Sequence, residues 1–126
     1  MRFGLIARGL DIFDLVPNGL LTQNELDAAK TVHFDYFNTQ DQPKLVWPPS
    51  FALVRAYLDQ LERNNGLAAD KIASTRAAVA DAEKLKGQAQ KDALNKLSQQ
   101  LHTDARSAGD QPKAHKLAFA VGDLAK

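Results

Sequence analysis

The stretch Lys44-Leu45-Val46-Trp47-Pro48-Pro49-Ser50-Phe51 separates two parts of the chain that differ in character. Most of the aromatic residues lie within it or before it, whereas most of the alanines follow it. Its two prolines cannot donate backbone hydrogen bonds and favour extended geometry in the residue before each, and the serine after them is suited to cap a helix. We therefore predict a stiff strap between an N-terminal arm, residues 1–49, and a helical module, residues 50–126. We expect Trp47 to cover the apolar surface of the helices rather than to bind a ligand.

The composition fits one ordinary domain, or a small domain with an arm, and it narrows the classes of function. The 126 residues carry a net charge of +1; the parts up to and after Pro49 carry −2 (four basic, six acidic) and +3 (twelve basic, nine acidic). Neither part has the basic character of a nucleic-acid-binding protein. Because the chain has no cysteine, disulfide scaffolds, thiol catalysis and zinc–thiolate sites are excluded.

The sequence shows neither a membrane span nor an export signal. No apolar run approaches the roughly 18 to 20 residues that cross a bilayer. Near the N-terminus, Arg8, Asp11 and Asp14 interrupt the place where the apolar region of a signal peptide would run. The sequence alone therefore leaves the compartment open.

Short apolar segments separated by turn residues make up the arm. Residues 5–16 alternate with the two-residue period of a half-buried strand and predict two short strands around Gly9. Pro17-Asn18-Gly19 predicts a turn after them, and residues 31–37 alternate again. Isolated strands are marginal in water, so these segments must join a sheet or lie on the helices that follow.

A capping box marks the start of a short helix within the arm. Thr22 is the expected N-cap and Glu25 its reciprocal partner, with Leu21 and Leu26 at the hydrophobic staple positions. The pattern predicts a helix at about residues 23–30, and it carries no indication of chemistry.

Apolar residues at helical spacing predict a small antiparallel up-and-down bundle of about four helices in the module. The helices are expected at about residues 51–63, 69–86, 88–105 and 112–124. We expect the first to end in a left-handed cap at Gly66. The residues expected to face the core are Phe51, Leu53, Val54, Tyr57, Leu58, Leu61, Ile72, Thr75, Val79, Ala82, Leu85, Ala93, Leu94, Leu97, Leu101, Ala114, Leu117, Ala118, Val121 and Leu124.

Two groups of residues could carry chemistry. His33 and Asp35 would share one face of an extended segment, and they could transfer protons or bind a metal. A solvated face of an edge strand explains them better, because no third ligand or activated nucleophile is nearby. His102 and His115 lie on different predicted helices, and metal binding there would need two further ligands, with Asp104 the only nearby candidate. We predict no catalytic, cofactor-binding or metal-binding residues.

Two segments resemble the C-terminal end of bacterial LVIVD-repeat β-propeller proteins. They are Ile6-Ala7-Arg8-Gly9-Leu10-Asp11-Ile12-Phe13-Asp14-Leu15 and Leu21-Thr22-Gln23-Asn24-Glu25-Leu26-Asp27-Ala28-Ala29. In that family a similar strand pair closes the last blade and a similar segment leads out of it. The likeness covers roughly residues 3–30, and the chain has no blades of its own. It implies that residues 1–49 hold the remnant of a last blade and a linker.

The helical module is similar in layout to FIMAH-type domains, small helical modules at the C-termini of exported bacterial proteins. The likeness lies in the tyrosine-bearing helix that ends in Asn65-Gly66-Leu67, the helix over residues 78–83, the break at Gly87 and the helix over residues 93–101. These families offer no established catalytic residues, so the resemblance implies no site.

The function expected from these features is that of a non-catalytic C-terminal accessory or interaction module. The chain would be a fragment of an exported or cell-surface bacterial β-propeller protein, and its partner would be that propeller or another protein. The alternative is a free-standing small helical interaction protein whose arm packs across its own bundle, or a homodimer of it in which strand pairing between two arms completes a small sheet. Neither hypothesis requires an enzyme activity, a cofactor, nucleic acid or a membrane span.

Overall fold

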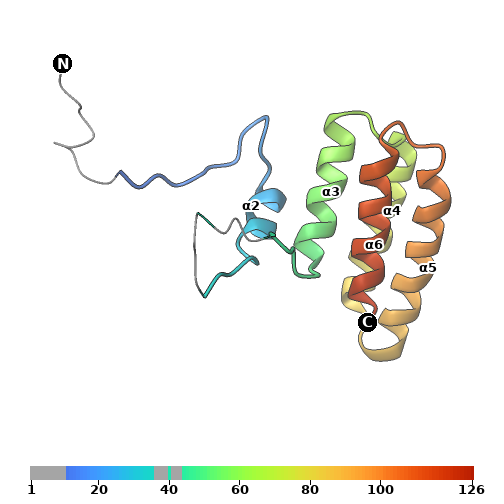
Figure 1. Ribbon diagram of the computed structural model, residues 1–126. Helices are drawn as coiled ribbons and strands as arrows, with labels where there is room; N and C mark the ends of the chain where they lie inside the picture. Colours follow the sequence, from blue (N-terminus) through green and yellow to red (C-terminus); the bar gives the residue numbers. More distant parts are fainter. Residues whose placement is uncertain (1–10, 36–39, 41–43) are drawn as a thin grey trace, which may run out of the picture.

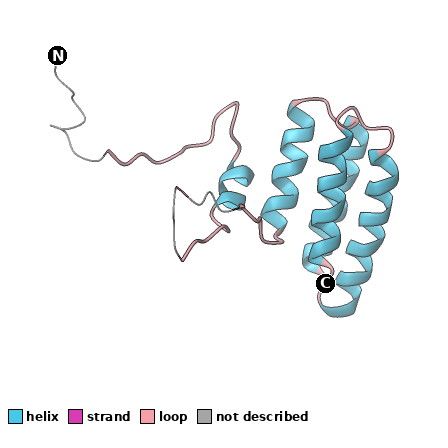
Figure 2. Ribbon diagram, viewed as in Figure 1, coloured by secondary structure: helices cyan, strands magenta, loops and turns pink. Residues whose placement is uncertain are grey.

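The computed structural model describes residues 11–35, 40 and 44–126, and all regular structure within them is helical (Figures 1 and 2). The helices are α2 (Gln23–Ala29), α3 (Phe51–Arg63), α4 (Ala69–Lys84), α5 (Gly87–Ala105) and α6 (Gln111–Leu124). Helices α3 to α6 lie side by side as a bundle, and the short α2 packs against α3 from outside (Figure 1). The prediction of a mainly helical chain with a bundle is confirmed.

Each bundle helix has two neighbours. Helix α3 packs against α4 and α6, and α5 packs against the same two helices from the opposite corner. Short loops join successive helices, so that neighbours along the chain run in opposite directions (Figure 1). No helix in the described residues is long and apolar enough to cross a membrane.

The core lies between the four bundle helices and is built from the predicted apolar stripes. The largest side chains with almost no exposure are Leu58, Leu61, Leu94, Leu101, Leu117, Val54, Val79 and Val121. Alanines fill the remaining contacts between the helices and allow the axes to approach closely, as Ala105 and Ala118 do with 0% exposure each. Leu85, which we expected to face inward, is instead 40% exposed. It follows the last residue of α4 in an extended conformation, and therefore leaves the helical stripe.

Helix α3 ends in a Schellman motif whose left-handed residue is Asn65 (φ 52°), not Gly66 as predicted. The amide of Gly66 donates to the carbonyl of Leu61 (2.8 Å), and that of Asn65 donates to Glu62 (3.2 Å). Gly66 is required for space instead, because a Cβ there would lie 2.6 Å from Oδ1 of Asn64 and 2.9 Å from Leu61.

The other helix ends follow the sequence signals more closely. Ser50 caps α3 by accepting a hydrogen bond from the amide of Leu53 (3.1 Å). Asp110 caps α6 by accepting from the amide of Lys113 (3.1 Å), with proline in the first turn. Gly87 has φ +63° at the start of α5, a conformation that favours glycine.

The predicted strands do not form in the described residues. Residues 11–16 and 31–35 have no regular structure, and the rest of these predicted segments, residues 5–10 and 36–37, lies outside the described residues. Local alternation specifies which faces a strand would present, but it does not supply the neighbouring strand that must satisfy the backbone groups.

Stability is expected to reside in the bundle core. Replacing Leu101, which is 2% exposed, with alanine should lower the free energy of unfolding by about 2–5 kcal/mol, because it removes buried apolar contacts and leaves a cavity. The matched control is Leu85→Ala at the exposed position, which should cost no more than about 0.5 kcal/mol. Urea unfolding followed by circular dichroism measures both values. Equal losses in the two variants would contradict this placement of the core.

Candidate functional site

The best-defined polar site in the described residues is the joint between α2 and the bundle, and it begins with the predicted capping box. The backbone amide of Glu25 donates to the Thr22 hydroxyl oxygen (3.2 Å), and the amide of Thr22 donates to the Glu25 carboxylate (2.8 Å). Both side chains also reach beyond their own helix. Thr22 donates its hydroxyl proton to Oδ2 of Asp59 on α3 (2.6 Å). The cap that starts α2 therefore also attaches it to the bundle.

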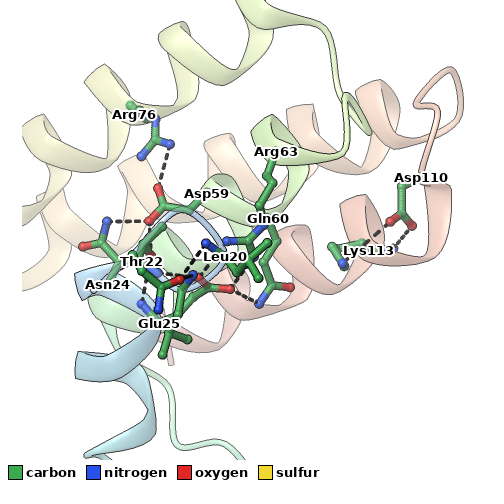
Figure 3. A network of polar contacts seen from close by, with 12 residues as sticks. Leu20, Thr22, Asn24, Glu25, Asp59, Gln60, Arg63, Arg76, Asp110 and Lys113 are labelled. Carbon is green, nitrogen blue, oxygen red and sulfur yellow. Dashed lines mark hydrogen bonds and ion pairs between the residues drawn. The ribbon is translucent and has the colours of Figure 1, made fainter. Parts of the chain in front are cut away.

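A single carboxylate connects three helices in this joint. Asp59 on α3 accepts hydrogen bonds from Thr22 (2.6 Å) and Asn24 (2.8 Å) at α2, and from Arg76 on α4 (2.7 Å; Figure 3). Burial of the Asp59 side chain, which is 10% exposed, opposes its ionisation. The three donors outweigh that effect and hold the pKa of Asp59 below its usual value. We call Thr22, Asn24, Asp59 and Arg76 the Asp59 cluster.

Glu25 forms a second attachment one turn along α2. Arg63 at the end of α3 donates to both of its carboxylate oxygens (2.7 and 3.1 Å), and Gln60 adds a third hydrogen bond (2.9 Å; Figure 3). The hydrogen bond from Arg63 is the main cause that lowers the pKa of Glu25 from 4.5 to about 2, against the opposing effect of burial. The Glu25 side chain is 9% exposed and the Arg63 side chain 33% exposed, so solvent reaches this pair from the Arg63 side.

An apolar hollow of about 380 Å³ lies beside these polar contacts. Its lining residues are Leu21, Glu25, Ala28, Ala29, Trp47, Leu53, Ala56, Tyr57 and Gln60. The strap at the end of the arm brings Trp47 to this place, where it is 40% exposed and covers part of the seam between α2 and α3. Burial raises the pKa of Tyr57. The hollow can accept an apolar or aromatic group. Its two polar groups are not free, because the Glu25 carboxylate already accepts hydrogen bonds from Arg63 and from the Gln60 amide.

The His33 and Asp35 side chains are both exposed, and no hydrogen bond or ion pair joins them in the described part of the chain. Neither residue lines the hollow beside Glu25 or the hollow lined by Thr22 and Asp59. The structure therefore gives these two residues no shared geometry that would support proton transfer.

The structure does bring His102 and His115 together. Their Nδ1 atoms are 3.2 Å apart across the α5–α6 contact, and the edge of one aromatic ring meets the face of the other where His102 contacts Phe119 (centroids 4.7 Å apart). Asp104, the only nearby candidate for a further ligand, forms an ion pair with Lys71 on α4 (3.2 Å). Among the described residues, no group of three or more histidine, aspartate or glutamate side chains could hold a metal ion.

The attachments made by Asp59, Arg63 and Arg76 were not predicted from the sequence. A usable signal is the charge pattern on α3, where Asp59 and Arg63 lie four residues apart on one face. That pattern predicts a local pair, whereas both side chains bind other helices. The capping box identified Glu25 and Thr22, but only in their local role.

Comparison of the chain with protein-family models, with curated proteins and with solved structures finds no match. The functional assignment consequently depends on the geometry of this chain and on the resemblances in its sequence.

The attachment of α2 is expected to fail in acid. The pKa of Glu25 is about 2 in the folded chain and 4.5 without its partners. The stability that the Glu25 carboxylate contributes is therefore complete above about pH 4.5 and is lost as the pH falls through about 2. Fluorescence of Trp47, the sole tryptophan, reports the state of the α2–α3 seam, and circular dichroism reports the bundle. We expect the Trp47 signal to change in this range.

The Glu25→Gln variant should show a perturbed Trp47 fluorescence signal already at neutral pH. Its change in acid should be smaller than that of the unmodified chain, because only the protonation of Asp59 then weakens the attachment of α2. The matched control is Glu83→Gln, because Glu83 pairs with Arg55, is 43% exposed and lies on α4, which does not pack against α2. An acid transition in Glu25→Gln identical to that of the unmodified chain would rule out the assigned role of Glu25.

Proposed function

We propose that the chain is a non-catalytic C-terminal accessory or interaction module of an exported or cell-surface bacterial LVIVD-repeat β-propeller protein. In this proposal the arm completes or braces the last blade of the propeller, and the bundle is the rigid body that carries the arm. The resemblance of residues 3–30 to that family supports a β-propeller as the partner. The geometry of the arm supports a contact in which the arm adds to the last blade.

The observation that carries the proposal is the exposure of residues 12–16, the segment of the arm that precedes α2. Ile12, Phe13, Leu15 and Val16 are 86%, 83%, 73% and 67% exposed. In an extended chain Phe13 and Leu15 point to one side, and Ile12 and Val16 point to the other with Asp14 between them. A segment with one apolar face and one mixed face matches a half-buried strand of a sheet. Adding it to the edge of a sheet would satisfy its backbone and cover its side chains.

The segment of the arm that precedes α2 leaves the bundle from a fixed point. A turn joins it to α2, in which the amide of Asn18 donates to the carbonyl of Leu21 (2.8 Å) and the Asn18 side chain accepts from the amide of Leu20 (2.8 Å). Helix α2 is in turn held by the Asp59 cluster and by Glu25. A partner that binds residues 11–16 is therefore held close to α2 and to the bundle.

The alternative is that the arm pairs with the arm of a second copy of this chain. The same exposed residues favour it, because two such segments could bury each other's apolar faces. The two functions differ in what lies next to Phe13: a strand of a propeller blade, or residues 11–16 of another copy.

Site-specific photocrosslinking tests the proposal in the cells that naturally make the protein. A photoreactive benzoyl-phenylalanine would replace Phe13, and in a matched control it would replace Phe119, which is also exposed (62%) but lies on the bundle. We expect position 13 to crosslink to peptides of a β-propeller, whether on the same polypeptide or another, in clear excess over position 119. Mass spectrometry of the crosslinked peptides identifies the neighbour.

Crosslinks from position 13 to the arm of a second copy would overturn the proposal in favour of the homodimer. Yields from position 13 no greater than those from position 119 would show that the arm has no stable neighbour, and would exclude both functions.

A further inference from the structure

The two histidines between α5 and α6 form a polar pair that the proposed function does not use. Their Nδ1 atoms are 3.2 Å apart, their ring centroids are 5.5 Å apart, and the ring planes are inclined by 35°. Both side chains are half-buried, so that solvent reaches the pair from one side. We propose that His102 and His115 form a two-histidine chelating site for a divalent transition-metal cation of the zinc, nickel and copper class.

The distance between the two nitrogens fits shared coordination. Histidine nitrogens bind zinc at about 2.0–2.1 Å in tetrahedral geometry, which places two of them about 3.3 Å apart. Imidazole suits zinc, copper and nickel, whereas magnesium and calcium prefer oxygen ligands. In the 3.2 Å contact one Nδ1 donates its proton and the other Nδ1 accepts it. Metal binding moves that proton to Nε2 of the same ring and leaves both Nδ1 lone pairs free for the cation.

The helix contact fixes this spacing before any metal binds. One turn from His102 along α5, the hydroxyl of Ser98 donates to the carbonyl of Ala118 on α6 (2.8 Å), in a buried hydrogen bond. Ala118 itself lies one turn beyond His115. A Cβ at Gly122 would be 3.0 Å from Oγ of Ser98, so the two helices are as close there as their side chains allow. The helix contact therefore sets the distance between the two nitrogens, which lowers the cost of bringing the ligands together. The 5.5 Å between the ring centroids corresponds to rings that face each other head-on, so binding requires each ring to turn until both Nδ1 lone pairs point at the cation.

The side chains around His102 and His115 leave the other coordination positions of a bound cation to solvent. Asp104, on the same helix as His102, is already paired with Lys71 (3.2 Å). Phe119 covers one ring by an edge contact and offers no ligand. The site is therefore open, with two protein ligands and positions for water or for a small molecule, unlike a closed four-ligand structural zinc site.

Thermal unfolding of the full chain with added metal tests this site. A cation that binds only the folded state raises Tm with increasing concentration. We expect ZnCl2 and NiCl2 to raise Tm and MgCl2 to leave it unchanged. The increase should disappear in His102→Gln and in His115→Gln. The third histidine provides the matched control, because His33→Gln changes an exposed imidazole outside the bundle and should keep the full response.

Equal metal responses in the unmodified chain and in His102→Gln would overturn the proposal, as would no response to zinc or nickel. Nuclear magnetic resonance of the unmodified chain keeps the test decisive if a variant unfolds. In imidazole ¹H–¹⁵N spectra, ZnCl2 should shift Nδ1 of His102 and His115 together and leave His33 in place. Shifts confined to His33, or absent from the pair, would also overturn it.

Discussion

The carboxylate of Asp59 is the constraint on which the arrangement of the N-terminal part depends, because it accepts hydrogen bonds from α2 and α4 while it lies on α3. Helix α2 has 7 residues, and an isolated helix of that length is unstable in water. Its own apolar contribution is small, with Leu26 and Ala28 buried. The polar attachments at Asp59 and Glu25 therefore determine whether α2 is folded, and with it the direction in which the arm leaves the bundle.

The periodic and capping signals predicted the helices well, because each depends on residues within a few positions of one another. The Thr22–Glu25 capping box is of this kind, as is the stripe that contains Leu94 and Leu101. The Asp59–Arg76 pair and the His102–His115 contact depend on how separate helices align, which local patterns do not specify. The strands expected within residues 11–16 failed for the same reason, since alternation does not supply a partner strand.

The two proposed activities lie on different parts of the molecule. The arm leads into α2 beside α3, whereas the histidine pair lies between α5 and α6, and α5 is the bundle helix diagonal to α3 (Figure 1). Changes at Phe13 should therefore leave metal binding unaffected, and changes at His102 should leave the arm unaffected. The bundle core connects the two regions mechanically, and no described polar network extends between them.

Amide hydrogen exchange of the full chain at low protein concentration tests the central claim, that the exposed apolar segment 12–16 leaves from an anchored helix. We predict that amides of residues 12–16 exchange as fast as those of an unstructured peptide. Amides within Gln23–Ala29 should be protected, though less than those of α3. If α2 exchanged as fast as residues 12–16, it would not be anchored. If residues 12–16 were protected in the isolated chain, this segment would not be available to a partner.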